Sequence, residues 1–254
     1  MNKTVFITGA TSGFGEAAAR IFAQNNFRLI LTGRRRERLQ QLQKELTGNR
    51  NTEVHLLPFD VQNHQAVVAA VASLPDSWQT VDVLINNAGL ALGREPFDDA
   101  LLSDWEQMID TNLKGLLYVT KAVLPLLKKS GSPHIINMGS IAGKEVYEKG
   151  NVYCATKHAV DAISKAMRID LLPHRIKVTA IHPGAAETEF SVVRFKGNQQ
   201  TAGAVYEGYQ PLTAHDVASI IYYTATLPPH VCINDLVVTC TQQGSATHFN
   251  KTGP

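Results

Sequence analysis

The sequence has few cysteines, little net charge and no long hydrophobic run. Its three cysteines, Cys154, Cys232 and Cys240, are odd in number and lack CxxC spacing, which argues against a disulfide framework and against a metal site. The 24 basic and 22 acidic side chains leave a charge of +2, too small to favour nucleic acid or an anionic membrane as partner. No apolar stretch reaches the length of a membrane span or a signal-peptide core. These absences predict a cytoplasmic protein with reduced thiols.

The chain length of 254 residues fits one α/β domain, and no repeat or linker divides it. Short runs rich in Val, Ile and Leu predict buried strands, and segments with helical spacing lie between them. The predicted strands are 3–8, 27–32, 54–59, 81–86, 134–138, 177–181 and 235–239, and the predicted helices are 15–25, 36–46, 65–74, 112–129 and 152–172. We predict a single domain over residues 1–254, an α/β Rossmann fold with a doubly wound, seven-stranded parallel sheet. Ligands bind at the carboxyl ends of such strands.

The least regular stretch of the sequence follows the sixth predicted strand, from residue 183 to residue 208. A long insertion over the carboxyl edge of the sheet is the usual place for a substrate lid. We therefore predict a lid there, with a surface excursion of no functional role as the alternative.

A glycine-rich turn, Thr8-Gly9-Ala10-Thr11-Ser12-Gly13-Phe14-Gly15, joins the first predicted strand to the first predicted helix. Gly9 would permit a sharp turn, Gly13 would let a diphosphate approach, and Gly15 would let the helix pack on the strand. Backbone N–H groups at a helix N-terminus bind phosphates. The order of strand, turn and helix favours a dinucleotide site over glycines that only cap a turn. Its predicted residues are Gly9, Thr11, Ser12, Gly13, Phe14 and Gly15.

No acidic residue ends the second predicted strand, where an NAD-binding fold of this kind usually places Asp or Glu. The strand continues instead as Gly33-Arg34-Arg35-Arg36. Arginines at the start of a helix oppose its dipole unless they share an anion, and a 2′-phosphate would be that anion. We predict NADP as the cofactor, held by Arg34, Arg35 and the Ser12 hydroxyl. The side chains of residues 36–38 are expected to be ordinary solvated surface.

Three polar residues form a candidate catalytic group. Tyr153 and Lys157 are four residues apart in a segment with helical spacing, and Ser140 closes the preceding strand. A phenol with a pKa of about 10 is a poor base at neutral pH, but an adjacent ammonium typically lowers that pKa by about 1–3 units. We expect Lys157 to lower the pKa of Tyr153, Tyr153 to carry the proton of a substrate hydroxyl, and Ser140 to hydrogen-bond the same oxygen.

These motifs together resemble the short-chain dehydrogenase/reductase family, from residue 3 to about residue 244. Thr8-Gly9-xxx-Gly13-x-Gly15 matches its cofactor turn, Asn86-Asn87-Ala88-Gly89 matches its fourth-strand motif, and Tyr153-xxx-Lys157 matches its catalytic signature. The resemblance implies an oxidoreductase that exchanges a hydride with a nicotinamide cofactor.

The resemblance also implies roles for single residues. Asp60 and Val61 would contact adenine, Asn112 would kink its helix and hold a proton-relay water, and Lys157 would also bind the nicotinamide ribose. The nicotinamide end would be held by Asn87, Ala88, Gly89, Tyr153, Lys157, Pro183, Gly184 and Thr188. Without the resemblance, Asn86 and Asn87 would be turn formers and Asp60 a helix cap.

The resemblance also predicts how the chain assembles. Family members are usually dimers or tetramers built on the helices predicted at 112–129 and 152–172, so a homotetramer is expected. The segment Thr241-Gln242-Gln243-Gly244 stands where the family often has a Gly-Gly pair.

Segments 90–96 and 188–197 resemble those of bacterial dehydrogenases that oxidise serine, L-allo-threonine and other 3-hydroxy acids. Such substrates carry a carboxylate, which an arginine can bind through two parallel hydrogen bonds. Arg194 is the predicted partner and Arg94 a weaker candidate, with Arg194 and Lys196 as solvated charges the alternative. The predicted substrate site comprises Ser140, Tyr147, Tyr153, Phe190 and Arg194.

Three functions stay open on the sequence alone. One is an NADP-dependent dehydrogenase of a small 3-hydroxy acid, the second a reductase of larger ketones or acyl thioesters, and the third a non-catalytic nucleotide sensor. Intact Ser140, Tyr153 and Lys157 disfavour the sensor. No evident basic surface would dock an acidic acyl carrier, which disfavours the thioester reductase.

Overall fold

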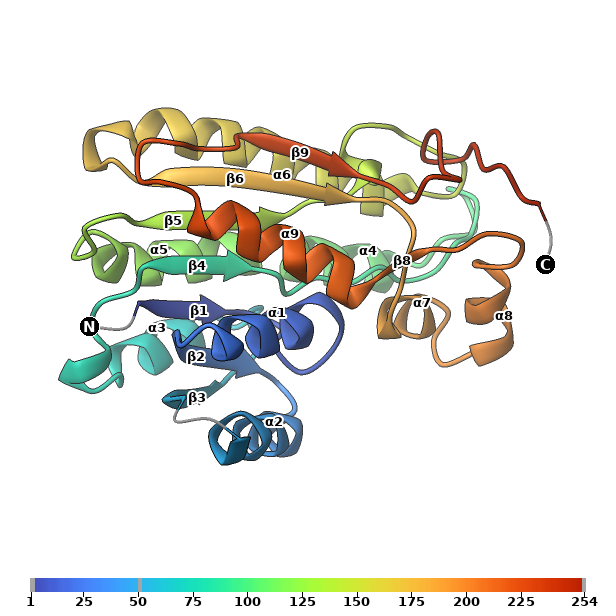
Figure 1. The fold of residues 1–254 in the computed structure, drawn as a ribbon. Coiled ribbons are helices and arrows are strands. Elements are labelled where there is room, and N and C mark those ends of the chain that lie inside the picture. Colours follow the sequence, from blue (N-terminus) through green and yellow to red (C-terminus); the bar gives the residue numbers. More distant parts are fainter. Residues whose placement is uncertain (1–2, 50–51, 253–254) are drawn as a thin grey trace.

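The computed structural model describes residues 3–49 and 52–252, so the ends of the predicted domain lie outside it. Seven parallel strands form one sheet in the order β3-β2-β1-β4-β5-β6-β9 (Figure 1). Their bounds are β1 Thr4–Ile7, β2 Arg28–Gly33, β3 Val54–Pro58, β4 Val83–Asn86, β5 His134–Met138, β6 Lys177–Pro183 and β9 Asp235–Val238. The strand order reverses between β1 and β4, and open α/β sheets bind ligands at such a point. The predicted seven-stranded, doubly wound sheet is confirmed.

Helices cover both faces of the sheet and bury two apolar clusters (Figure 1). Val5 and Ile7 of β1 point into one cluster while Phe6 points into the other, because successive side chains of a strand face opposite ways. One face is covered by α1 (Gly13–Gln24), α2 (Arg36–Asn49) and α9 (Ala214–Thr226), and the other by α3 (His64–Ala72), α5 (Leu116–Leu127) and α6 (Asn151–Asp170).

The helix predicted at 112–129 begins earlier than expected. It starts with α4 (Leu102–Ile109), passes through a π-helical turn at Asp110–Gly115 and continues as α5. The sequence of α4 does carry apolar spacing, with Leu102, Trp105 and Ile109 at i, i+3 and i+7, so this helix could have been predicted and was not.

Helix α9 was also missed, although its start is marked in the sequence. The Thr213 hydroxyl accepts a hydrogen bond from the Asp216 N–H, and the Asp216 carboxylate accepts one from the Thr213 N–H. This reciprocal arrangement is a capping box, whose Thr-x-x-acid pattern predicts a helix N-terminus.

The segment 183–208 is more regular than its sequence indicates. It contains β7 (Ala186–Glu187), α7 (Glu189–Arg194) and α8 (Gln199–Ala204), and β7 pairs with β8 (Leu212–Thr213). Figure 1 shows α7 and α8 beyond the carboxyl ends of the strands, at the edge where a ligand would bind. We call residues 183–208 the lid segment.

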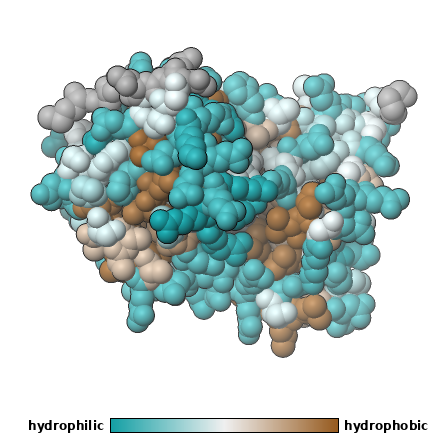
Figure 2. All heavy atoms as spheres, turned by 90° about the horizontal axis from the view of Figure 1, so that it is seen from below, coloured by the Kyte–Doolittle hydropathy of each residue, from teal (hydrophilic) through white to brown (hydrophobic). Residues whose placement is uncertain are grey.

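One face of the molecule is mainly hydrophilic. Seen from below, on the side of β3 and α2, most surface residues are hydrophilic, with apolar residues showing between them in separate areas (Figure 2).

Among residues 3–49 and 52–252, no helix is both long and apolar enough to span a bilayer.

Candidate active site

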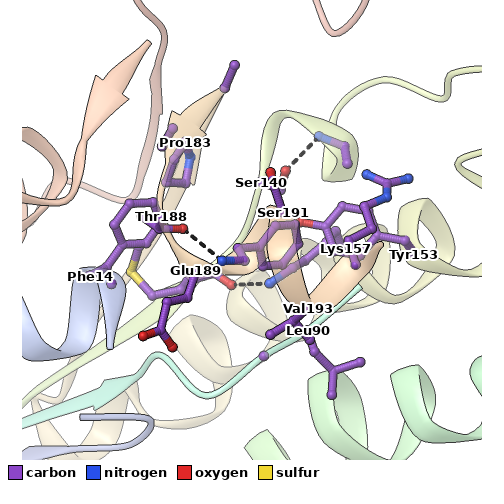
Figure 3. A pocket seen from close by; sticks show the side chains of 18 of the residues that line it. Phe14, Leu90, Ser140, Tyr153, Lys157, Pro183, Thr188, Glu189, Ser191 and Val193 are labelled. Atoms are coloured by element: carbon purple, nitrogen blue, oxygen red, sulfur yellow. Dashed lines mark hydrogen bonds between the residues drawn. The ribbon is translucent and has the colours of Figure 1, made fainter. Parts of the chain in front are cut away.

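A cavity of about 690 Å³ opens at the carboxyl edge of the sheet and extends beneath the lid segment. It brings together residues that are far apart in the sequence, and Figure 3 shows several of them around one space. The predicted site residues that line it are Gly9, Thr11, Ser12, Gly13, Phe14, Arg34, Arg35, Asp60, Val61, Asn87, Ala88, Gly89, Ser140, Tyr147, Tyr153, Lys157, Pro183, Gly184, Thr188, Phe190 and Arg194. Gly15 and Asn112 are the predicted residues that do not line it.

The glycine turn has the backbone that a dinucleotide requires. Gly9 and Gly13 have φ angles of +65° and +54°, which other residues rarely adopt. A Cβ at Gly15 would lie 2.4 Å from the Gly9 carbonyl oxygen, so only glycine lets α1 approach the turn. Ser12 begins α1 without a side-chain cap, which leaves the first N–H groups of the helix for an anion. This turn therefore fits a dinucleotide phosphate.

Asn86, the last residue of β4, and Asn87, which follows it, fix neighbouring segments through their side chains and do more than form a turn. Asn87 Nδ2 donates to the carbonyl oxygens of Thr8 and Gly9, at 2.9 and 3.2 Å. Asn86 is buried in the strand and donates to Thr120 Oγ1 at 2.8 Å and to Asn137 Oδ1 at 2.9 Å. The glycine turn is thus fixed to the neighbouring strand.

Arg35 lies across the glycine turn. Its Nη2 donates to Ser12 Oγ at 2.9 Å and to Thr11 Oγ1 at 2.9 Å, and its Nη1 donates to Glu189 Oε2 of the lid segment at 2.9 Å. Arg34 is more exposed, and its Nη1 lies 3.7 Å from Asp60 Oδ2.

Arg38 is exposed, as expected for residues 36–38, but its side chain is paired. Its Nη1 donates to Glu189 Oε1, so one carboxylate joins Arg35 and Arg38. The sequence did not predict the ion pairs of Glu189 with Arg35 and Arg38, because Glu189 is far from both arginines along the chain.

Asp60 and Thr188, which the resemblance places at the cofactor, also accept hydrogen bonds from backbone N–H groups two residues further along the chain. Asp60 Oδ1 accepts a hydrogen bond from the Gln62 N–H at 3.0 Å, but Asn63, not Asp60, caps α3. Thr188 caps α7, since its hydroxyl accepts from the Phe190 N–H at 3.2 Å. The alternative interpretation of Asp60 as a helix cap is therefore wrong.

Tyr153, Lys157 and Ser140 converge at the inner end of the cavity, as Figure 3 shows. Tyr153 is buried in α6, and Lys157 Nζ lies 6.0 Å from the centroid of its ring. The Lys157 ammonium donates to the Met138 carbonyl at 2.8 Å, and Ser140 Oγ accepts from the Ala142 N–H at 3.1 Å. The spacing of four residues on one helix face thus places these groups together, as predicted.

Burial is the largest influence on the acidity of Tyr153 and Lys157. It raises the pKa of the Tyr153 phenol above its ordinary value, although a hydrogen bond with Ser140 and the charge of Arg194 act in the opposite direction. Burial also lowers the pKa of Lys157 to about 8. The expected lowering of the Tyr153 pKa is therefore not met, because desolvation outweighs the nearby charges.

The loop that carries Ser140 rests on a charged cluster. The buried His182 ring has Nδ1 3.2 Å from the Ser140 carbonyl oxygen, and its Nε2 faces Asp161 and Asp235 at 3.6 and 3.7 Å. These three side chains have the spacing of metal ligands, but the Lys144 ammonium lies 2.8 Å from Asp161 Oδ1 and also pairs with Asp235. An internal cation thus balances the carboxylates beneath the loop.

Asn112 lies in the π-helical turn, where the resemblance implies a distorted helix. Its amide exchanges two hydrogen bonds of 2.8 Å with the backbone of Leu90 and donates to Thr156 Oγ1 at 3.1 Å. Asn112 therefore connects the loop after β4 to α6, and its role with a relay water stays a prediction.

Arg194 reaches the substrate end of the cavity from the last residue of α7. Its Nε donates to the Gly93 carbonyl at 3.2 Å, its Nη1 donates to Tyr147 Oη at 3.0 Å, and its Cζ lies 5.5 Å from the centroid of the Tyr153 ring. No hydrogen bond of Nη2 occurs among residues 3–49 and 52–252. The guanidinium is half-buried with one nitrogen open, and is not the solvated charge of the alternative interpretation.

Other residues complete the substrate end. The Phe190 and Tyr153 ring centroids are 5.7 Å apart, and Tyr147 also lines the cavity. Lys196 is not free, since its ammonium lies 2.8 Å from Asp104 Oδ2. Arg94 is exposed where it lines the cavity.

Gln243 is a further cavity residue that the sequence did not reveal. Its Oε1 accepts from the Ala185 N–H at 2.8 Å, next to Pro183 and Gly184. It lies in the segment that departs from the family's Gly-Gly pair, and that departure was the only signal.

Comparisons with known proteins agree with this geometry. A family model described as short chain dehydrogenase matches residues 3–199. The NADP-dependent 3-hydroxy acid dehydrogenase YdfG of Salmonella typhi is 51% identical over 231 residues, which are 91% of this chain and 92% of that protein. Sulfoacetaldehyde reductase 2 of Chromohalobacter salexigens is 48% identical over 244 residues, which are 96% of each chain.

A solved structure is similar over nearly the whole chain. The closed form of serine dehydrogenase complexed with NADP⁺ superposes with a TM-score of 0.91 at 47% identity, over 96% of this chain and 97% of that one. The glycine turn, the Ser-Tyr-Lys group and these matches lead to one conclusion. The chain belongs to the short-chain dehydrogenase/reductase family of oxidoreductases.

Proposed function

We propose that this enzyme transfers a hydride between NADP and a small 3-hydroxy acid of the serine or L-allo-threonine type, with Tyr153 as the general base and acid. The observation that carries the proposal is the position of Arg194. Its guanidinium lies beside the Tyr153 ring in the same cavity, and its Nη2 has no hydrogen-bond partner among residues 3–49 and 52–252. A cation at that place suits a substrate whose carboxylate is close to its reacting hydroxyl.

The chain's own residues would bind the cofactor and move the proton. The glycine turn would hold the diphosphate, Arg34 and Arg35 the 2′-phosphate, Asp60 and Val61 the adenine, and Pro183, Gly184 and Thr188 the carboxamide. When bound, the nicotinamide supplies the hydride acceptor in oxidation and the hydride donor in reduction. The other cofactor contacts that we propose are Asn87, Ala88, Gly89, Tyr153 and Lys157.

In oxidation Tyr153 Oη would take the proton of the substrate hydroxyl, and Ser140 Oγ would hold that oxygen in place. With its pKa lowered only to about 8, Lys157 keeps mainly its charged form at neutral pH and can stabilise the phenolate as it forms. We assign the relay of the proton toward solvent to a water positioned by Asn112. In reduction the same steps run backwards.

A second candidate function uses the same site. A sulfonate has the same charge as a carboxylate, and the guanidinium of Arg194 can hydrogen-bond either group. Two sulfoacetaldehyde reductases of Chromohalobacter salexigens are 48% and 49% identical to the chain. A small aldehyde with a sulfonate would therefore fit the same Tyr153 and Arg194.

A spectrophotometric screen tests the proposed function. Reduction of NADP⁺ is followed with serine, L-allo-threonine, other 3-hydroxy acids and simple alcohols, and oxidation of NADPH is followed with sulfoacetaldehyde and with uncharged ketones. We expect the highest kcat/KM with a small anionic substrate. A clear preference for uncharged ketones or for acyl thioesters would refute the proposal.

The variant Arg194→Ala should lose activity selectively on anionic substrates. A lost charge-assisted hydrogen bond is worth about 1.5–3 kcal/mol, so kcat/KM for serine-like acids should fall by about tenfold to a hundredfold. Activity on an uncharged secondary alcohol of similar size should change little. Steady-state kinetics on the two substrates make the comparison.

Lys196→Ala is the matched control for Arg194. It removes another cation of the lid segment, but one whose ammonium is paired with Asp104. This variant should affect acid and alcohol to the same extent. If Arg194→Ala also lowers both activities equally, Arg194 only holds the lid segment in place through its contacts with Gly93 and Tyr147. Arg94 would then be tested as the partner of the substrate anion.

We further propose a homotetramer in the cytoplasm. The helices on which tetramers of this kind are built carry exposed apolar side chains here, including Leu117 of α5 and Ile169 of α6. Cys154, Cys232 and Cys240 are free thiols, which suits a reducing compartment. Light scattering coupled to size-exclusion chromatography should give a mass of four chains. A monomer at micromolar concentration would contradict the tetramer.

A further inference from the structure

Two arginines beside the glycine turn share one carboxylate from the lid segment. Glu189 Oε2 accepts from Arg35 Nη1 at 2.9 Å, and Glu189 Oε1 accepts from Arg38 Nη1. Each oxygen of the carboxylate thus has a different guanidinium partner. The three residues come from two separate parts of the fold, since the arginines flank the start of α2 and Glu189 begins α7.

The carboxylate occupies the donors that a phosphate beside Ser12 would use. The remaining nitrogens of Arg35 are directed inward, where Nε donates to Thr11 Oγ1 at 3.1 Å and Nη2 donates to Ser12 Oγ at 2.9 Å. These bonds fix the guanidinium over the glycine turn. The Nη1 that faces outward is the one that Glu189 holds.

A 2′-phosphate would be the stronger partner for this pair of arginines. It carries more negative charge than a carboxylate and offers three acceptor oxygens. It would also repel the Glu189 carboxylate if both lay against the same guanidinium groups. The phosphate and the carboxylate therefore compete for Arg35 and Arg38.

From this geometry we propose that Glu189 is an internal stand-in for the cofactor's 2′-phosphate. It pairs with Arg35 and Arg38 while the site holds no NADP and yields them to the phosphate when NADP binds. Arg38 thereby becomes a third arginine of the phosphate site, beyond Arg34 and Arg35. The proposal rests on the proposed use of NADP.

The competition lowers the selectivity of the enzyme for NADP over NAD. NAD has no 2′-phosphate, so its binding leaves the contacts of Glu189 with both arginines intact. NADP must give up those contacts before its phosphate is bound. Glu189 thus acts as a specificity-determining residue, at the opposite end of α7 from Arg194.

The variant Glu189→Gln tests the proposal by removing the charge and keeping the shape. Exposed ion pairs contribute about 0.2–1 kcal/mol each, so the loss of two competing pairs should tighten NADPH binding by about twofold to thirtyfold. The dissociation constant for NADH should change by less than about twofold on the same scale. Both constants are measured by calorimetric titration of the full-length protein.

Glu187→Gln is the matched control. Glu187 also lies in the lid segment and is exposed, but it forms no ion pair within residues 3–49 and 52–252. This variant should leave both dissociation constants unchanged, so a gain seen only in Glu189→Gln reports the contacts with the arginines.

The outcomes separate the proposal from the proposed function. If the wild-type protein binds NADPH no better than NADH, the use of NADP is wrong. If it prefers NADPH but Glu189→Gln binds NADPH more weakly, Glu189 orients Arg35 for the phosphate and the stand-in is refuted; unchanged binding refutes it as well. Arg38→Ala should weaken NADPH selectively, in the wild-type and in the Glu189→Gln background. No effect in either background would remove Arg38 from the phosphate site.

Discussion

Replacement of Tyr153 by Phe should reduce turnover by at least the 10²- to 10⁴-fold that is typical for the loss of a general acid or base. The variant lacks only the phenolic oxygen, and its ring can keep the contact with Phe190, whose centroid is 5.7 Å away. The cofactor site should stay intact. Steady-state kinetics and a titration with NADPH provide the two measurements.

Tyr147→Phe is the control for this variant. Tyr147 lines the same cavity, but its Oη is a partner of Arg194 and has no proposed role in proton transfer. We expect a clearly smaller loss of turnover than in Tyr153→Phe. Near-normal turnover of Tyr153→Phe with NADPH still tightly bound would show that the proton follows another route.

The double variant Arg34→Ala, Arg35→Ala should weaken NADP binding far more than NAD binding. Each charge-assisted contact with the 2′-phosphate is worth roughly 1.5–3 kcal/mol. Arg34 is exposed, so its share belongs at the low end, and we expect a loss of about 10²-fold or more in the affinity for NADP. The ratio of the kcat/KM values for NADP⁺ and NAD⁺ measures the change in selectivity.

Arg36→Ala provides the control for the double variant. Arg36 belongs to the same run and is exposed, and no ion pair or hydrogen bond of its side chain occurs within residues 3–49 and 52–252. Its loss changes the net charge but should not change the selectivity. Equal losses for NADP and NAD in the double variant would mean that Arg34 and Arg35 hold the structure of the turn and do not bind the phosphate.

The sheet was predictable because its signal is local. The five inner strands are short apolar runs and are mostly buried, and buried parallel strands require such runs whatever the rest of the chain does. The edge strands β3 and β9 are only partly buried, although all seven were predicted to be buried. Helix α4 also has a local signal, the helical spacing of Leu102, Trp105 and Ile109, and its omission from the prediction was an oversight and not a limit of the sequence.

The candidate site was predictable where spacing along the chain determines geometry. Tyr153 and Lys157 meet because they are four residues apart on one helix, and Gly15 must be glycine because of a contact within its own turn. Contacts between residues from distant segments have no comparable signal in the sequence. The carboxylate of Glu189 between two arginines and the amide of Gln243 at Ala185 depend on how the lid and the C-terminal segment fold back.

The burial of a side chain is a second property that a sequence motif does not predict. The Tyr-Lys motif predicts a phenol with a lowered pKa, but the folded chain buries that phenol and raises its pKa. The sequence identifies which charges lie near the group, whereas only the fold determines how much water is removed.

One measurement tests the central claim most directly. A 3-hydroxy acid carrying deuterium on the carbon of its reacting hydroxyl is oxidised with NADP⁺, and the reduced cofactor is analysed by mass spectrometry. If the enzyme moves a hydride from that carbon while Tyr153 takes the proton, each molecule of NADPH formed should contain one deuterium in the wild-type protein, and Tyr153→Phe should form almost none. Turnover without deuterium in the cofactor, or no turnover with any small hydroxy acid, would contradict the account.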